Sequence, residues 1–151
     1  IKVIKFLYDI LKDTFNINAQ NYNDDTIFML ATQNTDIAVI KYVYDMFKDK
    51  IDINKTNNDG NTVLMFALEH SNIQIVKFLY KIFKDHIDFN KQNYNGDTSL
   101  MLAIKNTDVE VTKYVLCKFK DEINIDKQNK NGATALMLAI QKSNSDIIQS
   151  I

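Results

Sequence analysis

The stretch from Asn57 to Leu68, which reads NNDGNTVLMFAL, decides the fold because it returns at a fixed interval along the chain. In each copy the threonine is followed three residues later by Met and five residues later by Ala. The four threonines are each 36 residues apart, at Thr26, Thr62, Thr98 and Thr134. A period of this length indicates an array of structural repeats.

Each repeating unit is predicted to contain two helices. The first starts at the recurring threonine, which serves as N-cap, and runs for about two turns, as over 63–69. The second has a broad apolar face with helical spacing, shown by Ile75, Val76, Leu79, Ile82 and Phe83. Residues with capping oxygens stand before it in every unit, at Thr35-Asp36, Ser71-Asn72, Thr107-Asp108 and Ser143-Asn144.

The glycines mark a third feature, a polar finger between units. Gly60, Gly96 and Gly132 are the only glycines and share one register, where we expect a positive φ. The chain is therefore predicted to form a single domain over residues 1–151. It begins with the second helix of a partial repeat (1–15) and continues as units 16–51, 52–87, 88–123 and a truncated 124–151.

Composition narrows the classes of function. The net charge is -1 and all 18 basic residues are lysines, which argues against nucleic acid as a partner. No run of 18 uncharged apolar residues occurs, so no membrane span is predicted. The single cysteine, Cys117, favours a reducing compartment, and we expect a cytoplasmic, intracellular protein.

Motifs for chemistry are missing from the sequence. The segments around Gly60 and Gly96 lack the acidic residues that begin and end a calcium loop, and no phosphate-loop string occurs. His70 and His86 have no Cys or carboxylate cluster at metal-ligand spacing, and Cys117 has no histidine near it in sequence. We therefore predict no enzyme activity, no metal and no cofactor.

The repeating residues resemble the ankyrin repeat family. Its pattern, D-x-N followed by D-x-x-G-x-T-P-L-H-x-A, is matched by Asp52-Ile53-Asn54 and by Asn57 to Ala67. The match returns at Asp88 to Ala103 and Asn124 to Ala139, and more loosely at Asn16 to Ala31. The resemblance implies an all-α solenoid of stacked helix-turn-helix units with projecting β-turn or hairpin fingers.

Two departures from the family pattern carry expectations of their own. The family's His is replaced by Met in every unit, so we expect a first helix that is held at its start more by packing than by polar contacts. The period is 36 rather than the family's 33, with the extra residues after the apolar core of the second helix. That helix is predicted to be about one turn longer, with Phe47, Phe83 and Phe119 folding over its end.

In function, the resemblance implies a non-catalytic scaffold that binds a protein partner on its concave face, made of finger tips and first helices. Two alternatives remain open: the targeting module of a larger enzyme or ubiquitin-ligase adaptor, and a structural spacer. Tyr22 and Tyr94 are expected to be the main anchors. The full predicted set is Tyr22, Asp25, Gln33, Asn58, Asp59, Asn61, Glu69, His70, Tyr94, Asn95, Asp97, Lys105, Lys130 and Gln141.

The two ends lack a polar capping repeat. Val3 to Leu11 and Ile147 to Ile151 are therefore expected to expose apolar surface. This predicts either that the chain is a segment of a longer protein or that it associates end to end with another copy. The abundance of Asn, Lys and Ile indicates an AT-rich coding sequence, which suggests a role in host–virus interaction by resemblance alone.

Overall fold

The computed structural model describes residues 2–11, 14–34, 36–70, 72–106, 108–142 and 145–150. Helix α1 (Lys2–Leu11) is followed by helix pairs whose members each begin 36 residues after their counterparts. The first helices of the pairs are α2 (Ile27–Thr32), α4 (Val63–Glu69), α6 (Ser99–Lys105) and α8 (Ala135–Gln141). The second helices are α3 (Ile37–Phe47), α5 (Ile73–Phe83), α7 (Val109–Phe119) and α9 (Ser145–Ile148).

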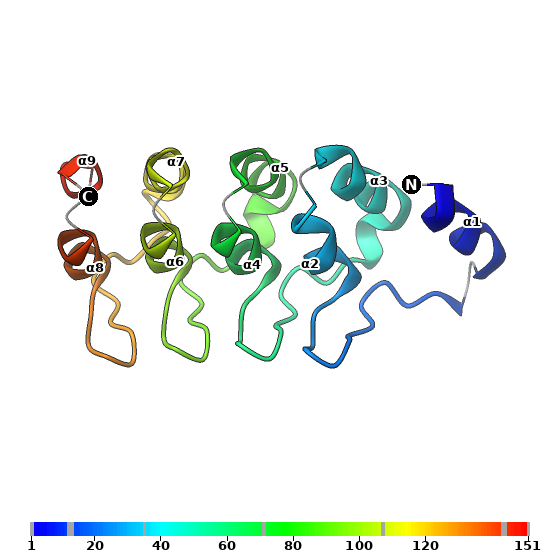
Figure 1. The fold of residues 1–151 in the computed structure, drawn as a ribbon, viewed down its shortest axis with the longest axis horizontal. Coiled ribbons are helices and arrows are strands. Elements are labelled where there is room, and N and C mark those ends of the chain that lie inside the picture. Colours follow the sequence, from blue (N-terminus) through cyan, green and yellow to red (C-terminus); the bar gives the residue numbers. More distant parts are fainter. Residues whose placement is uncertain are drawn as a thin grey trace.

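The pairs stack side by side in two rows (Figure 1). Along one row α2 packs on α4, α4 on α6 and α6 on α8, while the second helices form the other row. The fingers project from the first helices, across the direction in which the helices run (Figure 1). The predicted all-α repeat solenoid is confirmed. The unit boundaries stay a prediction, with each predicted unit from 16–51 onward containing one pair.

The helix starts follow the predicted caps. The hydroxyl oxygens of Thr26, Thr62, Thr98 and Thr134 each accept a hydrogen bond from the backbone N–H of the Met three residues on, at 3.2, 3.5, 3.4 and 3.3 Å. These are long bonds, whereas the methionines of the first three pairs are almost fully buried, as expected for a start held by packing. The second helices are capped by Asp36, Asn72 and Asp108. The other predicted caps, Thr35, Ser71, Thr107, Ser143 and Asn144, lie outside the described residues.

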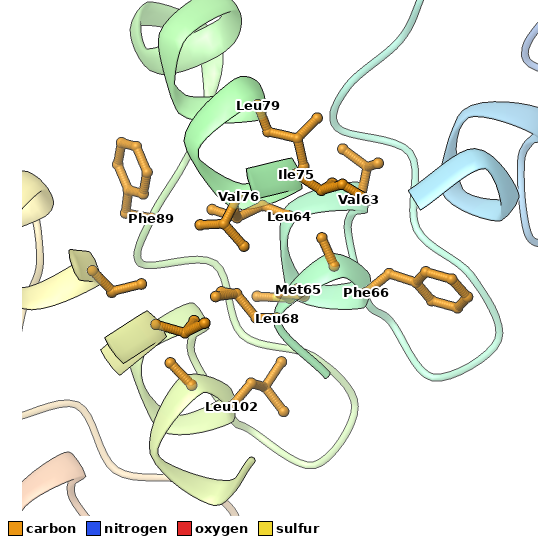
Figure 2. Packing of buried hydrophobic residues seen from close by; sticks show 14 of the residues in the cluster. Val63, Leu64, Met65, Phe66, Leu68, Ile75, Val76, Leu79, Phe89 and Leu102 are labelled. Carbon is orange, nitrogen blue, oxygen red and sulfur yellow. The ribbon is translucent and has the colours of Figure 1, made fainter. Parts of the chain in front are cut away.

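The core is built between the two rows and between neighbouring pairs. Leu64 and Leu68 of α4 lie against Ile75 and Val76 of α5 (Figure 2). Ala67 is fully buried, and its small side chain allows neighbouring helices to approach closely. A larger residue at this position would have to displace packed neighbours.

The extra residues of the 36-residue period differ in part from the prediction. Phe47, Phe83 and Phe119 are buried at the last residue of α3, α5 and α7. The α-helix does not continue beyond them. The chain tightens into short 3₁₀ helices, η2 (Lys48–Lys50) and η3 (Lys84–His86), because this tighter turn satisfies terminal carbonyls of the helix.

Glycine is required at two finger positions for two reasons. Gly60 and Gly96 have φ of +77° and +76°, as predicted, and Asp24 takes the left-handed conformation in the first finger with φ of +58°. A Cβ on Gly60 would lie 2.8 Å from the backbone nitrogen of Tyr94, and one on Gly96 would lie 2.7 Å from that of Lys130. Each finger is therefore shaped to receive the next one.

The ends differ from the prediction in one respect. Ile147 is buried, not exposed, because α9 packs against both α7 and α8. The apolar side chains exposed near that end are on α8 instead: Leu136, Met137 and Ile140. At the other end Phe6 and Ile10 are exposed as expected, while the side chains of Val3, Leu7 and Leu11 lie outside the described part of the chain.

Candidate functional site: the groove between fingers and first helices

The fingers are joined sideways through their backbones. The backbone N–H of Asn58 donates to the carbonyl of Asn23, that of Tyr94 to Asp59, and that of Lys130 to Asn95, at 2.9, 2.9 and 3.0 Å. Each bond links the tip of one finger to the tip of the next. The tips therefore form a connected edge beside the row of first helices, and we call the surface between them the groove.

Buried asparagines hold each finger in shape. Asn57, Asn93 and Asn129 are buried, and the side-chain oxygen of each accepts two backbone N–H bonds within its own finger. The side-chain NH₂ of each donates to the preceding finger, reaching Asp25, Asn61 and Asp97 at 3.1, 2.9 and 3.0 Å. We call this the asparagine ladder. Buried polar groups with full sets of partners fix one register between neighbours.

The ladder changes the interpretation of three predicted contact residues. Asp25, Asn61 and Asp97 were expected on the exposed groove, but all three are buried. The reason is that each accepts the hydrogen bond from the asparagine of the next finger. These side chains are held in hydrogen bonds between neighbouring fingers.

The other predicted residues are accessible. Lys105 is partly exposed, and the rest of the predicted set is exposed: Tyr22, Gln33, Asn58, Asp59, Glu69, His70, Tyr94, Asn95, Lys130 and Gln141. The tips carry Tyr22 and Tyr94, and both rings are open to solvent. Tyr94 lies over Gly60 of the preceding finger, which supports its ring from one side.

The structure brings some of these residues together in two pockets at equivalent places in successive repeats. The first, which we call the acidic pocket, has a volume of about 440 Å³ and is lined by residues that include Asp25, Gln33, Asp59, Phe66, Glu69 and His70. The second, which we call the lysine pocket, has a volume of about 350 Å³ and is lined by Glu69, Asn95, Asp97, Leu102, Lys105 and Asn106. Residues Asp59, Phe66, Glu69 and His70 of the acidic pocket stand 36 positions before Asn95, Leu102, Lys105 and Asn106 of the lysine pocket.

The charged and polar side chains of the lysine pocket pair with groups inside or next to it. The Lys105 ammonium lies 2.5 Å from a carboxylate oxygen of Asp97, whose side chain is only 2% exposed. Asn106 donates from its side chain to the carbonyls of Leu68 and Glu69, which satisfies the C-terminal end of α4. The polar groups of this pocket are therefore largely occupied by one another.

The carboxylates of the acidic pocket have different hydrogen-bond partners. Glu69 accepts a hydrogen bond from the Asn61 amide at 2.9 Å, while Asp25 accepts only amide N–H bonds. No lysine lines this pocket among the described residues. Partial burial raises the pKa of the Glu69 carboxyl, the hydrogen bond from Asn61 opposes that rise, and the nearby Asp59 charge adds to it.

His70 lies in the same pocket. Its Nδ1 lies 2.7 Å from the carbonyl oxygen of Phe66. Because a carbonyl only accepts, Nδ1 is the donor in this contact. The centroids of the Phe66 ring and the His70 imidazole lie 4.7 Å apart. Figure 2 shows the Phe66 ring pointing away from the other labelled core side chains.

Sequence reasoning missed the ladder asparagines and Phe66. The ladder had a visible signal, since asparagine recurs at Asn21, Asn57, Asn93 and Asn129 in one register. An identical polar residue in every unit indicates a structural role. Phe66 had no such signal, because its register is apolar in every unit, with Leu30, Leu102 and Leu138 as its counterparts.

Metal ligands, membrane-spanning helices and the cysteine bear on other kinds of site. The described residues contain no group of three or more His, Cys, Asp or Glu side chains arranged to hold a metal ion. None of the helices described is both long and apolar enough to cross a membrane. Cys117 is exposed on α7, away from both histidines in sequence.

The chain matches a known protein family. The family model described as ankyrin repeats (3 copies) matches residues 1–93 and 80–151. No curated protein matches the chain.

Proposed function

Because the chain belongs to the ankyrin repeat family, we propose that it is a non-catalytic scaffold that binds a protein partner in its groove. Members of this family are generally modules for protein–protein interaction. The proposed contact residues are the accessible members of the predicted set, with Tyr22 and Tyr94 as anchors. Asp25, Asn61 and Asp97 are left out of the contact set because they are buried.

One observation carries the proposal: the buried frame is the same from repeat to repeat while the groove changes. The threonine cap, the methionine and the ladder asparagine recur unchanged in each unit. At the end of the first helix, in contrast, successive units carry Gln33, Glu69, Lys105 and Gln141. The recurring residues maintain the stack, and varied groove residues supply chemical specificity for one partner over others.

The tyrosines support the same interpretation. Both stand on finger tips with exposed rings, and a tyrosine supplies a large contact area with few rotatable bonds. The connected backbone edge holds the tips in place before a partner arrives. A surface arranged in advance loses less conformational entropy on binding.

The test is affinity capture with the tagged chain, followed by mass spectrometry. Three baits are compared: the unchanged chain, a groove variant with Tyr22→Ser and Tyr94→Ser, and a control variant with Lys81→Ser and Cys117→Ser on the second helices. We expect at least one protein that the unchanged chain and the control retain and that the groove variant loses. Equal recovery by all three baits would contradict binding in the groove and would favour a structural spacer.

The alternative of a targeting module predicts a second result, which is that the captured protein is chemically modified. A targeting module of a larger enzyme or ubiquitin-ligase adaptor also binds through its groove, but the captured protein is then modified when the full-length parent is present. Ubiquitin transfer to the captured protein, or its absence, separates that alternative from a simple scaffold.

End-to-end association is a second proposed interaction. Leu136, Met137 and Ile140 are exposed on α8, whereas their counterparts in α6 are covered by the next pair. A helix from another copy would cover the same surface. Light scattering across a concentration series should show dimers that Met137→Lys removes, and a monomer at every concentration would contradict this proposal.

We also propose that the protein works inside the cell, in the cytoplasm. Cys117 is exposed and is the single cysteine, and an accessible thiol persists most readily in a reducing compartment. A role in host–virus interaction is proposed on composition and resemblance alone. Identification of the captured partner would test both.

A further inference from the structure

The acidic pocket and the lysine pocket are the same cavity built twice with different charges. In the lysine pocket the position at the end of the first helix is Lys105, and its ammonium rests on the buried carboxylate of Asp97. In the acidic pocket the same position is Glu69, paired with Asn61. The exchange replaces a cation by an anion at the end of the first helix, and its partner changes from the carboxylate of Asp97 to the amide of Asn61.

The result is an excess of acceptors around the acidic pocket. Among the described residues Glu69 accepts one side-chain hydrogen bond, on Oε2, so its Oε1 is open to a donor. Asp59 is exposed at the rim, and His70 lines the same pocket. Behind them Asp25 is a buried carboxylate that faces amides and no cation.

We propose that the acidic pocket receives a lysine or arginine side chain of the protein partner, which binds the carboxylates of Glu69 and Asp59. This rests on the proposed function and names the chemistry that the partner must bring. The cation would lie between Asp59 and Glu69, with the Phe66 and His70 rings beside its apolar stem. Since Glu69 ionises more readily beside a cation, its raised pKa favours the same occupant.

The charge along the groove sets an orientation for that partner. Acidic groups lie on the second repeat, at Asp59 and Glu69, and lysines lie farther along, at Lys105, Lys130 and Lys142. Lys105 is occupied by Asp97, while Lys130 is exposed on a finger tip. A segment with a basic residue over the second repeat and an acidic residue toward the fourth fits this pattern.

The chain supplies its own matched variants. Glu69→Gln removes the charge and keeps the shape, and glutamine already stands in this register at Gln33 and Gln141. The double variant Asp97→Asn with Lys105→Glu gives the lysine pocket the counterparts of Asn61 and Glu69. The first variant should lose the cation site, and the second should gain a new one.

The test is a nuclear magnetic resonance titration of the full ¹⁵N-labelled chain. The probes are three blocked nine-residue Gly/Ser peptides that differ only at the centre, which is Arg, Gln or Glu. We expect the Arg peptide to shift the backbone amides of Asp59, Glu69 and His70 saturably. Its affinity should fall at least about fivefold in Glu69→Gln, and the double variant should show matching new shifts at Asn95 and Asn106.

Three outcomes would overturn the inference. They are no saturable shift with the Arg peptide, equal shifts with all three peptides, and unchanged affinity in Glu69→Gln. A folded-state spectrum of each variant without peptide shows that any loss is local.

Glu69→Lys in the capture experiment separates this inference from the proposed function. Loss of a groove-dependent partner by about tenfold or more supports both. A partner that still binds through Tyr22 and Tyr94 but ignores Glu69→Lys overturns the cation site and leaves the scaffold standing. A saturable Arg-peptide site without any groove-dependent protein supports the cation chemistry and contradicts the scaffold.

Discussion

The second repeat (52–87) and the third (88–123) share their threonine cap, buried methionine and ladder asparagine and differ at their groove. Met65 and Met101 are both fully buried, and the ladder asparagines Asn57 and Asn93 make the same set of bonds. At the groove, Glu69 of one repeat stands where Lys105 stands in the other. The fold therefore depends on what the repeats have in common, and we propose that partner choice depends on where they differ.

The largest predicted effect tests the shared interior. Leu64→Ala and Leu100→Ala each remove a side chain that is at most 2% exposed, and each should lower the free energy of unfolding by about 2–5 kcal/mol. The two losses should be similar. Urea unfolding followed by circular dichroism measures both.

Leu136→Ala is the matched control for that pair. It has the same register on α8 but its side chain is 42% exposed, so its loss should be well below that of the other two. Equal losses at all three positions would show that stacking on the next pair does not determine the stability of this register.

The second prediction concerns the fingers. Gly60→Ala and Gly96→Ala combine left-handed strain, about 1–2 kcal/mol, with overpacking against the next finger, about 1–3 kcal/mol. Gly132→Ala has the same φ but open space around it, and only the strain applies. Thermal unfolding should therefore rank Gly132→Ala as the mildest of the three, and the opposite order would disprove the close contact between fingers.

The third prediction is that replacing the charged groove residue with glutamine changes the free energy of unfolding in opposite directions in the two repeats. Lys105→Gln leaves the buried Asp97 without its cation and should destabilise the chain at pH 7 by about 1 kcal/mol, reduced by the partial exposure of Lys105. Glu69→Gln should stabilise it slightly, by under about 1 kcal/mol, because the site is partly exposed.

The pH dependence follows from the direction of the Glu69 shift. Its pKa is raised in the folded state, so the protonated side chain favours folding. That contribution is present below the ordinary glutamate pKa of 4.5 and is lost as the pH rises through the folded value. The advantage of Glu69→Gln should therefore be seen at pH 7 and disappear near pH 4, and an advantage that persists at pH 4 would refute the assigned cause.

The smallest effect on stability is predicted for the exposed tips. Tyr22→Ser should change the free energy of unfolding by less than about 0.5 kcal/mol, because its ring is fully exposed. Tyr94→Ser should cost slightly more, since the ring lies over Gly60. Urea unfolding measures both variants. A loss of more than about 2 kcal/mol in the free energy of unfolding for either one would show that its tyrosine stabilises the stack.

The fold could be predicted because its determinants are local. Each recurring threonine, methionine and glycine has a role set by a few neighbours in sequence, and the helix starts and positive φ angles follow from it. The recurring asparagine signals a structural role, but its partners could not be predicted from the same pattern, because the bond from Asn93 to Asn61 spans 32 residues. For the same reason Asp97 was expected to be exposed, although the next finger covers it.

The pockets could not be predicted from the sequence either. The contact between Asn61 and Glu69 joins the base of a finger to the end of a helix eight residues later. Helical periodicity says nothing about a pair that crosses from loop to helix. The burial of Ile147 likewise depends on α7 and α8, which its own sequence does not reveal.

The most direct test transfers polar side chains from the third repeat to the second and leaves the apolar core unchanged. The variant Asn61→Asp, Glu69→Lys and His70→Asn gives the second repeat the counterparts of Asp97, Lys105 and Asn106, so a buried ladder acceptor changes together with two groove residues. If the groove side chains contribute little to the stability of the stack, the free energy of unfolding of this variant in urea should stay within about 1 kcal/mol of that of the unchanged chain. A loss as large as that of Leu64→Ala would contradict the account, because groove and frame would then be a single unit.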